Sequence, residues 1–459
     1  MKKFFGKFLF YIMILIYILV VTLLSPVFII ILFFIKDLKK GLLNRFIPFK
    51  FRKDKKIIVH ASSTGEAILA YNLFEDRANY TYFNQGAFEI FSQKKVESYP
   101  LPFESIFAIL LFITLNNYST IVILEQEIWP AFIFLNRLFK KKILLLNCNM
   151  YEKSFQFQRK FKFLFSGLFS LFDEIIAKSN LDMEKILYFT KKINVKNLEN
   201  FKILSSFKNL TIDENNLDNQ KIQTCTDKKK IILFSSFHQQ EFYIASEIIK
   251  EIKNRKFINK EFDSNRVKYI IAPRHLEKIK YLLDEFKNSK ISYDLLSNYI
   301  QNNENKLDEN SNKINTEKLD DLKLLIRNIQ EGLFEKDILI IDKYGFLSYI
   351  YGYCIVSIIG GSFNNKGGQN FIESVMHKVP VIIGPSYENF QDLMEQFSGP
   401  WLKIIENFKD EKELISLIIN FLTQLFDKDN QIIYDKLESK ILQLKKIAEK
   451  QNEYILNLI

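Results

Sequence analysis

The sequence predicts an α/β protein made of two doubly wound domains with a cleft between them. Apolar runs of strand length alternate with helical stretches, which is typical of a parallel sheet covered by helices on both faces. The alternation occurs twice, on either side of a polar stretch without periodicity. At 459 residues, the chain is also too long for one ordinary hydrophobic core.

Composition narrows the class of protein. Hydrophobic residues make up 48% of the chain and charged residues 25%, so most of the chain is expected to fold. The net charge of +11 is compatible with a nucleic acid, an anionic membrane or an acidic substrate as partner. The three cysteines lie far apart without a CxxC pair, which favours a reducing compartment and predicts neither a disulfide framework nor a zinc site.

An apolar segment opens the chain, and we expect residues 1–36 to form a membrane anchor. Residues 8–35 carry no charge over roughly 28 positions, whereas a membrane span needs ~20. A signal peptide would have a shorter apolar region and a small-residue cleavage site. Basic residues are denser after the segment than before it, which predicts that the following domains face the cytoplasm. They form a collar expected to bind anionic headgroups: Lys36, Lys39, Lys40, Arg45, Lys50, Arg52, Lys53, Lys55 and Lys56.

The first domain is expected over residues 37–206. Its main predicted strands are KIIVHAS (56–62), STIVILEQE (119–127) and KILLLNCNM (142–150), and its main predicted helices are GEAILAYNLFEDR (65–77), WPAFIFLNRLFKK (129–141) and NLDMEKILYF (180–189). A polar linker is expected over 207–230.

The second domain is expected over residues 231–435, followed by a C-terminal helix over 436–459. Its predicted strands are KIILFSSF (230–237), VKYIIAPRH (267–275), DILIID (337–342), CIVSIIGGS (354–362) and VPVIIGP (379–385). Residues 298–321 are rich in Asn, Lys and Asp, and predict a polar surface insertion or a disordered loop.

Two glycine pairs in GGSFNNKGGQNFIESVMHKVPVIIGP, residues 360–385, predict a ligand site at two successive strand ends. Glycine permits tight turns and close approach of backbone to a ligand, and ligands of open α/β sheets bind at the carboxyl ends of strands. The helix expected after Gly368 would direct free N–H groups at a phosphate. Asn370 and Glu373 lie near its start, and Asn389 follows the next strand. The alternative is a pair of ordinary strand-to-helix turns, since neither a Walker loop nor GxGxxG is present.

The first domain carries a comparable motif, HASSTGEA, in which Ser63, Gly65 and Glu66 follow a strand. A carboxylate at a helix start that lines a cleft could act as a general base, or it could only complement the helix dipole. Glu125 and Glu127 end another strand with side chains on one side, which indicates hydroxyl binding or a solvated loop.

Two further strand ends in the second domain carry polar side chains. His238 follows the strand at 230–237, and Arg274 lies at the end of the strand at 267–275, where it could pair with a phosphate. The spacing of the four histidines gives no HxxH or HExxH motif, so no metal site is predicted.

Taken in order, the motifs HASSTGE, EQEIWP, SFHQQE, PRH, DKYGFL, GGS, GGQNFIE and GPSYENF resemble the pattern of the 3-deoxy-D-manno-octulosonic acid (Kdo) transferases of lipopolysaccharide assembly. The resemblance covers nearly the whole chain outside the linker and the insertion. It implies the GT-B fold, with two Rossmann-like domains and the site between them. It also implies an inverting transfer of Kdo from CMP-Kdo to a lipid A precursor, at the cytoplasmic face of a bacterial inner membrane, without a metal or other cofactor.

The same resemblance implies roles for the site residues. Glu66 would be the general base. The acceptor side would include Ser63, Gly65, Glu125 and Glu127. The donor side would include His238, Arg274, Gly345, Gly361, Ser362, Asn370, Glu373 and Asn389.

Three departures from the family pattern bear on this expectation. Asn149 stands where the family has Arg, Phe346 where it has Glu, and Gln369 where it has His. Because Glu66 and Arg274 remain, we expect an active but divergent transferase rather than an inactive relative.

Other classes remain open at this point. One is another nucleotide-sugar enzyme on the GT-B fold with a different donor or acceptor, such as another membrane-anchored glycosyltransferase or a sugar 2-epimerase. The expected membrane anchor argues against a soluble epimerase. Another is a non-catalytic sugar- or lipid-binding relative. Nucleic-acid binding is not expected, because the positive charge concentrates at the membrane collar and no recognisable binding module is present.

Overall fold

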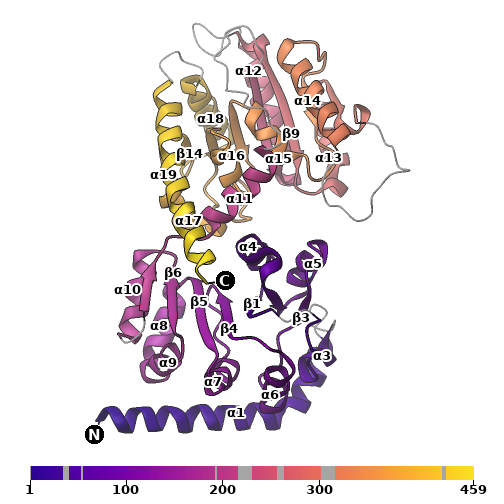
Figure 1. Ribbon diagram of the computed structural model, residues 1–459. Coiled ribbons are helices and arrows are strands. Elements are labelled where there is room, and N and C mark those ends of the chain that lie inside the picture. Colours follow the sequence, from indigo (N-terminus) through magenta and orange to yellow (C-terminus); the bar gives the residue numbers. More distant parts are fainter. Residues whose placement is uncertain are drawn as a thin grey trace. The chain divides into compact units, whose positions relative to one another are not determined.

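The computed structural model describes residues 2–34, 41–52, 55–191, 194–214, 230–255, 263–300, 316–425 and 431–458. The chain divides into two compact units (Figure 1). The first unit contains Met1–Lys208 together with Lys445–Ile459, and the second contains Asn209–Leu444.

The first unit is built on a seven-stranded parallel sheet of order β3-β2-β1-β4-β5-β6-β7. Its strands are β1 (Ile57–Ala61), β2 (Asn79–Tyr82), β3 (Ser98–Pro100), β4 (Thr120–Leu124), β5 (Lys142–Cys148), β6 (Glu174–Ala177) and β7 (Asn194–Asn197). Its helices are α1 (Lys2–Phe34), α3 (Leu42–Phe46), α4 (Thr64–Phe74), α5 (Gln85–Gln93), α6 (Ile106–Leu115), α7 (Pro130–Leu138), α8 (Glu152–Lys160), α9 (Lys162–Phe169) and α10 (Asn180–Phe189), and α11 (Lys202–Glu214) begins in this unit.

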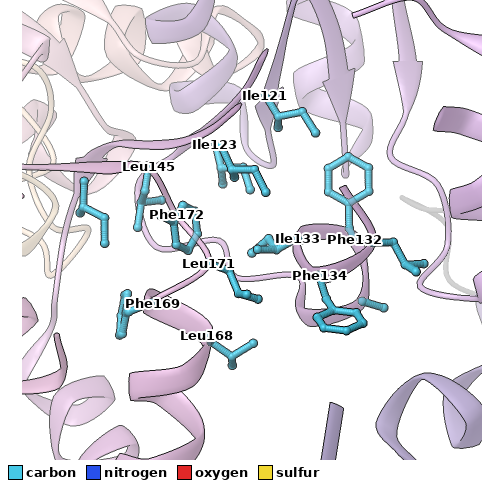
Figure 2. Close-up of a cluster of buried hydrophobic side chains, with 14 of the residues drawn as sticks. Ile121, Ile123, Phe132, Ile133, Phe134, Leu145, Leu168, Phe169, Leu171 and Phe172 are labelled. Atoms are coloured by element: carbon cyan, nitrogen blue, oxygen red, sulfur yellow. The ribbon is translucent and has the colours of Figure 1, made fainter. Parts of the chain in front are cut away.

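The core of the first unit lies between the sheet and its covering helices. Ile121 and Ile123 share one face of β4, because alternate residues of a strand point the same way. Figure 2 shows them in one cluster with Phe132 and Ile133 of α7 and with the side chains of Leu168, Phe169, Leu171 and Phe172. β4 is buried on both faces, as expected for a central parallel strand.

The second unit is built on another seven-stranded parallel sheet, of order β10-β11-β9-β8-β12-β13-β14. Its strands are β8 (Lys230–Phe237), β9 (Val267–Pro273), β10 (Tyr293–Leu295), β11 (Ile338–Ile340), β12 (Val356–Ile359), β13 (Val381–Ile383) and β14 (Leu402–Ile404). Its helices are α12 (Phe242–Asn254), α13 (Ile279–Asn288), α14 (Thr316–Glu331), α15 (Leu347–Ile350), α16 (Ile372–Met376), α17 (Gln391–Phe397) and α18 (Glu411–Leu425), and α19 (Gln431–Leu456) runs on into the first unit.

In each sheet the chain crosses once from one side of the sheet's first strand to the other. In the first sheet the crossing point lies between β1 and β4, and in the second it lies between β8 and β12. Such a switch point opens a crevice at the carboxyl ends of its two strands, where ligands of doubly wound sheets bind. The segments that follow these four strands are therefore where a site is expected.

The apolar helix α1 lies along the first unit, against α6, α7 and α9 (Figure 1). Phe10, Ile14 and Ile18 are buried at the spacing of one helical face. The opposite face is apolar and exposed, and Leu23 is 70% exposed. Residues 8–28 are long and apolar enough to cross a membrane by length and composition.

The predicted fold class is confirmed, since both parallel sheets and the N-terminal apolar helix are present. Several bounds differ from the predicted ones. α11 extends past position 207, where the linker was expected to begin, and residues 215–229 lie outside the described residues. Of the predicted insertion, residues 301–315 lie outside the described residues, and α14 begins at Thr316. The predicted C-terminal helix begins earlier, at Gln431.

One prediction about the basic collar is wrong. Arg45 lies on α3 and is 3% exposed, so it is not part of an exposed basic collar. Its guanidinium lies over the Phe83 ring, 4.9 Å from the centroid. Of the other collar residues, Lys36, Lys39, Lys40 and Lys53 lie outside the described residues.

Candidate active site

The segment that leaves β1 forms the N-terminus of α4 and fixes the Glu66 carboxylate. Ser63 is the N-cap, and its hydroxyl accepts the amide N–H of Glu66 at 3.3 Å. In return, the Ser63 hydroxyl donates to Glu66 Oε1 at 3.0 Å. The amide N–H of Ser62 donates to Glu66 Oε2 at 2.7 Å. This reciprocal arrangement is a variant of the capping box, in which a Glu at the third helical position reaches back to the cap.

Glu66 is a buried carboxylate with a raised pKa. The side chain is 8% exposed, and desolvation raises its pKa to about 7. The Ser62 amide and the Ser63 hydroxyl oppose this shift, and the charges of Glu125 and Glu127 add to it. The end of β1 and the loop after β4 therefore meet at the switch point of the sheet, and they bring together the three carboxylates singled out from the sequence.

A polar chain leads from the sheet to Glu127. Burial raises the pKa of Glu127, and the Ser62 side chain opposes this by hydrogen bonding to the carboxylate. Ser62 Oγ also lies 3.1 Å from Nε2 of His60, whose Nδ1 lies 3.0 Å from Thr81 Oγ1. Burial lowers the pKa of His60 to about 3, so the ring is neutral. If Ser62 donates to Glu127, it accepts from His60 Nε2–H, and Thr81 donates to Nδ1.

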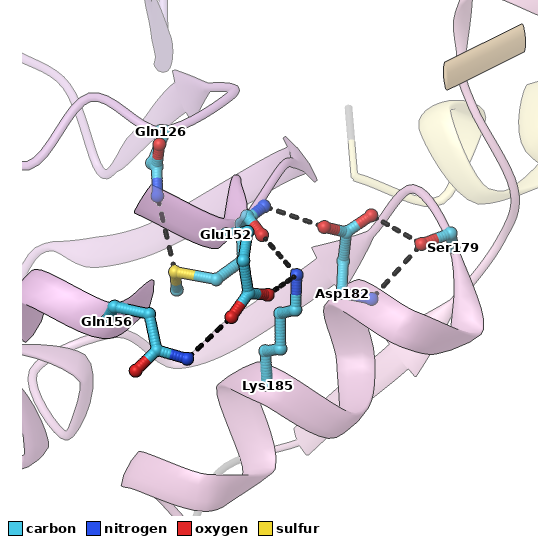
Figure 3. Close-up of polar contacts among 7 residues, drawn as sticks. Gln126, Glu152, Gln156, Ser179, Asp182 and Lys185 are labelled. Carbon is cyan, nitrogen blue, oxygen red and sulfur yellow. Dashed lines mark hydrogen bonds and ion pairs between the residues drawn. The ribbon is translucent and has the colours of Figure 1, made fainter. Parts of the chain in front are cut away.

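The loop after β5 holds the position where the family has an arginine. Asn149 is buried, and Met150 next to it donates its amide N–H to Asp182 at 2.7 Å. Lys185 donates to the Met150 carbonyl at 3.1 Å and pairs with Glu152 at 3.0 Å (Figure 3). This network fixes the loop without placing a guanidinium in it.

Glycine and Glu241 shape the corresponding switch point of the second unit. Glu241 is fully buried and accepts three backbone N–H groups, from His238 at 2.9 Å, Gly361 at 2.8 Å and Phe363 at 3.0 Å. A Cβ on Gly360 would come within 2.3 Å of the Ser236 carbonyl, so the β12 exit requires glycine there. Gly361 has a φ of 72°, which glycine adopts without strain.

Ser362 supports this loop from inside. Its side chain is fully buried; its hydroxyl donates to the Ile359 carbonyl at 2.5 Å and accepts the Gly384 amide at 2.8 Å. The hydroxyl therefore joins the exits of β12 and β13, and it is not exposed for a direct contact with a donor.

Two histidines, Arg274 and Lys366 lie near the Gly361 loop. His238 and His275 rings lie 5.3 Å apart. The pKa of His238 is lowered, first by burial and then by the charges of His275, Arg274 and Lys366. The Arg274 side chain is exposed, and its backbone is fixed by a 2.9 Å hydrogen bond from its amide to the Phe237 carbonyl. The positive charges of Arg274 and Lys366 suit a phosphate.

Gln369, which replaces the family histidine, lies against His238 with Nε2 atoms 3.2 Å apart. It follows Gly367 and Gly368, which have φ values of 78° and 75°. The Gly367 amide donates to Ser386 Oγ at 2.8 Å, and the Gly368 amide donates to the Gly361 carbonyl at 3.0 Å. The second glycine pair therefore joins the loops after β12 and β13.

The predicted helix after Gly368 is shorter than expected. α16 spans only Ile372–Met376, and Asn370 precedes it, accepting the Ile372 amide at 3.1 Å. Asn370 Nδ2 also donates to Glu373 Oε1 at 2.8 Å, so the two predicted site residues contact each other. The Asn389 backbone lies in the short helix Glu388–Phe390, and its side chain lies outside the described residues.

The segment after β11 contains the second departure from the family pattern, Phe346 in place of Glu. Gly345 is exposed, with a φ of 92°. Phe346, which stands where the family has Glu, is 4% exposed and packs in the core between the sheet and α14. This position has become part of the core and contributes no carboxylate.

Three residues that build the two sites were not among the predicted site residues: Ser62, His60 and Glu241. Glu241 lies in the motif SFHQQE, and its spacing to His238 was the available signal. Within the part of the chain that the structure describes, no group of three or more His, Cys, Asp or Glu side chains could hold a metal ion.

Two doubly wound domains, each with polar side chains gathered at its switch point, have the architecture of the GT-B class. Residues 40–205 match the family model described as 3-Deoxy-D-manno-octulosonic-acid transferase (kdotransferase). The 3-deoxy-D-manno-octulosonic acid transferase of Rickettsia bellii is 28% identical and covers 84% of this chain and 84% of its own length. That of Aquifex aeolicus is 27% identical and covers 91% of this chain and 99% of its own. These similarities support a divergent member of this family.

A solved structure agrees with the fold. The UDP-GlcNAc 2-epimerase from Neisseria meningitidis matches with a TM-score of 0.50 and 10% sequence identity, over 87% of this chain and 99% of its own. At this identity the likeness concerns the two-domain fold alone.

Proposed function

We propose that this protein transfers Kdo from CMP-Kdo to a hydroxyl group of a lipid A precursor, with inversion, in lipopolysaccharide core assembly. Similarity to the Kdo transferase family supports the donor and the reaction class. The observation that carries the chemistry is Glu66, a buried carboxylate with a pKa of about 7 at the switch point of the first sheet. A general base works best when its pKa lies near the operating pH.

Glu66 supplies the base in this proposal. Each carboxylate oxygen already accepts one hydrogen bond, so each keeps a lone pair for the acceptor hydroxyl. As the acceptor oxygen forms a bond to the anomeric carbon of Kdo, its proton passes to Glu66. The bond between that carbon and the phosphate oxygen breaks, and CMP leaves with the electron pair. Glu125 and Glu127 keep the pKa of Glu66 high and are positioned to bind acceptor hydroxyls.

The second unit would hold the donor. Arg274 and the neighbouring cations would bind the phosphate of CMP-Kdo and stabilise the charge that develops on the departing CMP. Glu241 fixes the Gly361 loop so that its backbone can approach the nucleotide. Asn370, Glu373, Gly345 and Asn389 stay proposed donor residues.

The helix α1 would attach the enzyme to the cytoplasmic face of the inner membrane. It packs lengthwise on the first unit: the Tyr17 hydroxyl donates to Glu104, Thr22 Oγ1 accepts the Ile106 amide at 3.0 Å, and the Phe28 and Phe103 rings lie 5.5 Å apart. A helix held along a polar domain over this length cannot also cross the bilayer. We therefore propose that α1 lies in the membrane interface with its exposed apolar face in lipid.

A transfer assay tests this function. Detergent-solubilised full-length protein is mixed with CMP-Kdo and a lipid A precursor, and mass spectrometry follows the lipid. The wild type should add the mass of Kdo, and Glu66→Gln should lower the rate by about 10²–10⁴-fold. Glu89→Gln, an exposed carboxamide change on α5, is the matched control and should keep the wild-type rate. A folded wild type that transfers nothing would contradict the donor and acceptor assignment, and other nucleotide sugars would then be tested as donors.

A further inference from the structure

A cavity of about 210 Å³ lies in the first unit beneath α1. Tyr17, Val21 and Phe28 line it from α1, and Phe83, Phe103 and Trp129 line it from the domain. An engineered apolar cavity of ~150 Å³ admits benzene, so this cavity has room for a segment of a hydrocarbon chain. Its wall is apolar apart from a few polar groups, and one of these is a buried guanidinium.

That guanidinium belongs to Arg45, which also lines the cavity. Arg45 is 3% exposed and donates to the carbonyl oxygens of Phe83 and, at 3.5 Å, of Leu101. Its Nε has no hydrogen-bond partner, and within the described ranges no carboxylate lies within ion-pair distance of it. Buried arginines are normally paired, because an uncompensated charge is costly away from water. The structure therefore leaves a buried positive charge that faces a hydrocarbon-lined space.

Glu104 lines the same cavity, but both oxygens of its carboxylate already accept hydrogen bonds from the protein. Oε1 accepts the amides of Ala131 at 2.8 Å and Phe132 at 3.2 Å, in the first turn of α7. Oε2 accepts the Tyr17 hydroxyl. Glu104 thus compensates the N-terminus of α7 and ties α1 to it, so the charge of Arg45 stays available for an external anion.

The cavity lies between α1 and residues next to the candidate active site. One wall is α1, whose opposite face is exposed and apolar, and the other wall includes Trp129. Trp129 lies two residues after Glu127, and its ring contacts His60 edge-on with centroids 6.3 Å apart. A chain that entered from the membrane side would therefore end beside the carboxylates of the candidate active site.

We propose that this cavity binds a segment of an acyl chain of an anionic lipid, with Arg45 paired to the lipid's acidic group. The lipid could be a membrane phospholipid or the acceptor itself, since both offer an acyl chain next to an anionic group. The proposal rests on the proposed membrane attachment of α1 but not on sugar transfer, so it is tested without a donor.

Quenching of Trp129 by brominated acyl chains tests the proposal. The chain has two tryptophans, and Trp401 belongs to the second unit, so full-length Trp401→Phe reports on Trp129 alone. The protein is mixed with vesicles of brominated phosphatidylglycerol or brominated phosphatidylcholine. Val21→Phe narrows the cavity, and Val20→Phe makes the same change on the exposed face of α1, where Val20 is 45% exposed. Arg45→Met removes the charge, and thermal unfolding checks that each variant is folded.

Brominated phosphatidylglycerol should quench Trp129, and brominated phosphatidylcholine should quench it less. Val21→Phe should remove the quenching, and Val20→Phe should keep it. Arg45→Met should weaken binding of the anionic lipid by about 10- to 100-fold. Equal quenching in Val21→Phe and Val20→Phe would overturn the proposal, even if Arg45→Met failed to fold. Unbrominated lipid A precursor would relieve the quenching if the acceptor's own chain takes the cavity, and would leave it unchanged if a phospholipid is resident.

Discussion

Ser63 and Glu66 hydrogen bond to each other in both directions at the start of α4, with the Ser63 hydroxyl donating to Oε1 at 3.0 Å and accepting the Glu66 amide at 3.3 Å. The cap of the helix and the orientation of the proposed base thus depend on one pair of residues. Changes at either position should affect both the stability of the first unit and the titration of Glu66.

Substitution of Ser63 by Ala should move the acid side of the pH–rate profile to higher pH. The Ser63 hydroxyl lowers the pKa of Glu66, whose value of about 7 should therefore rise when that donor is lost. Loss of the N-cap should also cost about 1 kcal/mol of stability. The profile of kcat/KM against pH measures the first effect, and urea unfolding measures the second. An unchanged profile would mean that Glu66 is not the group that limits the rate at low pH.

Substitution of Glu127 by Gln should move the acid side of the pH–rate profile to lower pH. The negative charge of Glu127 raises the pKa of Glu66, so its removal should lower that pKa and preserve activity at lower pH. The same profile measures this change. A shift in the same direction for Ser63→Ala and Glu127→Gln would contradict the assignment.

Glu66→Gln should stabilise the protein increasingly as the pH rises. In the folded state the pKa of Glu66 is about 7, above its ordinary value of 4.5, so the carboxyl group contributes stability below pH 4.5 that is lost as the pH rises through 7. A glutamine keeps both local hydrogen bonds, by accepting from Ser62 and donating to Ser63, and has no charge to bury. The melting temperature of the variant should exceed that of the wild type more at pH 8 than at pH 5. A constant difference would show that Glu66 is not buried as a charge.

Arg274→Ala should weaken binding of CMP by about 10- to 100-fold, the effect of losing a hydrogen bond to a charged group. Titration calorimetry at two salt concentrations measures it, and the loss should be smaller at high salt because screening already weakens the pair. Lys280→Ala, an exposed change on the nearby α13, is the control. Equal effects of the two substitutions would indicate a general loss of positive charge rather than a phosphate contact.

Gly360→Ala should inactivate the protein, whereas Gly65→Ala should not destabilise it. A Cβ on Gly360 would approach the Ser236 carbonyl to 2.3 Å, and only a backbone shift could relieve that contact. A Cβ on Gly65 would meet no atom within 4 Å, and alanine favours a helix over glycine by about 1 kcal/mol. Thermal unfolding compares the two variants. If the folded Gly65→Ala protein lost activity, that would support the proposed approach of the acceptor to Gly65.

The alternation of strands and helices, and the polar residues at the strand ends, could be predicted from the sequence. Long central strands such as β4 and β8 were recognisable by their apolar runs, and the strand-end rule located Glu66 and Gly361 correctly at the two switch points. The strands β2, β3, β7, β10 and β14 were missed, because each has only three or four residues and, unlike the equally short β11 and β13, is not an apolar run. Arg45 was misplaced because a basic residue after an apolar segment resembles a membrane collar, and its burial depends on distant contacts with Phe83 and Leu101.

The roles of Glu241 and of the Ser62–His60–Thr81 chain also depend on contacts between residues that are distant in the sequence or on different strands. Glu241 begins a helix, as many exposed glutamates do, and only the folded loop shows that it accepts three backbone N–H groups. The Ser62–His60–Thr81 chain crosses between two strands, and its partners cannot be paired without the register of β1 on β2.

The return of α19 to the first unit affects the order in which the protein can be completed during synthesis. Gln451 is fully buried; its side chain accepts the Leu204 amide at 3.1 Å and donates to the Leu198 carbonyl at 2.8 Å. The ribosome must therefore make the whole second unit before the first unit can close. The domain that carries the proposed base reaches its final form only after the nucleotide-binding domain has been translated.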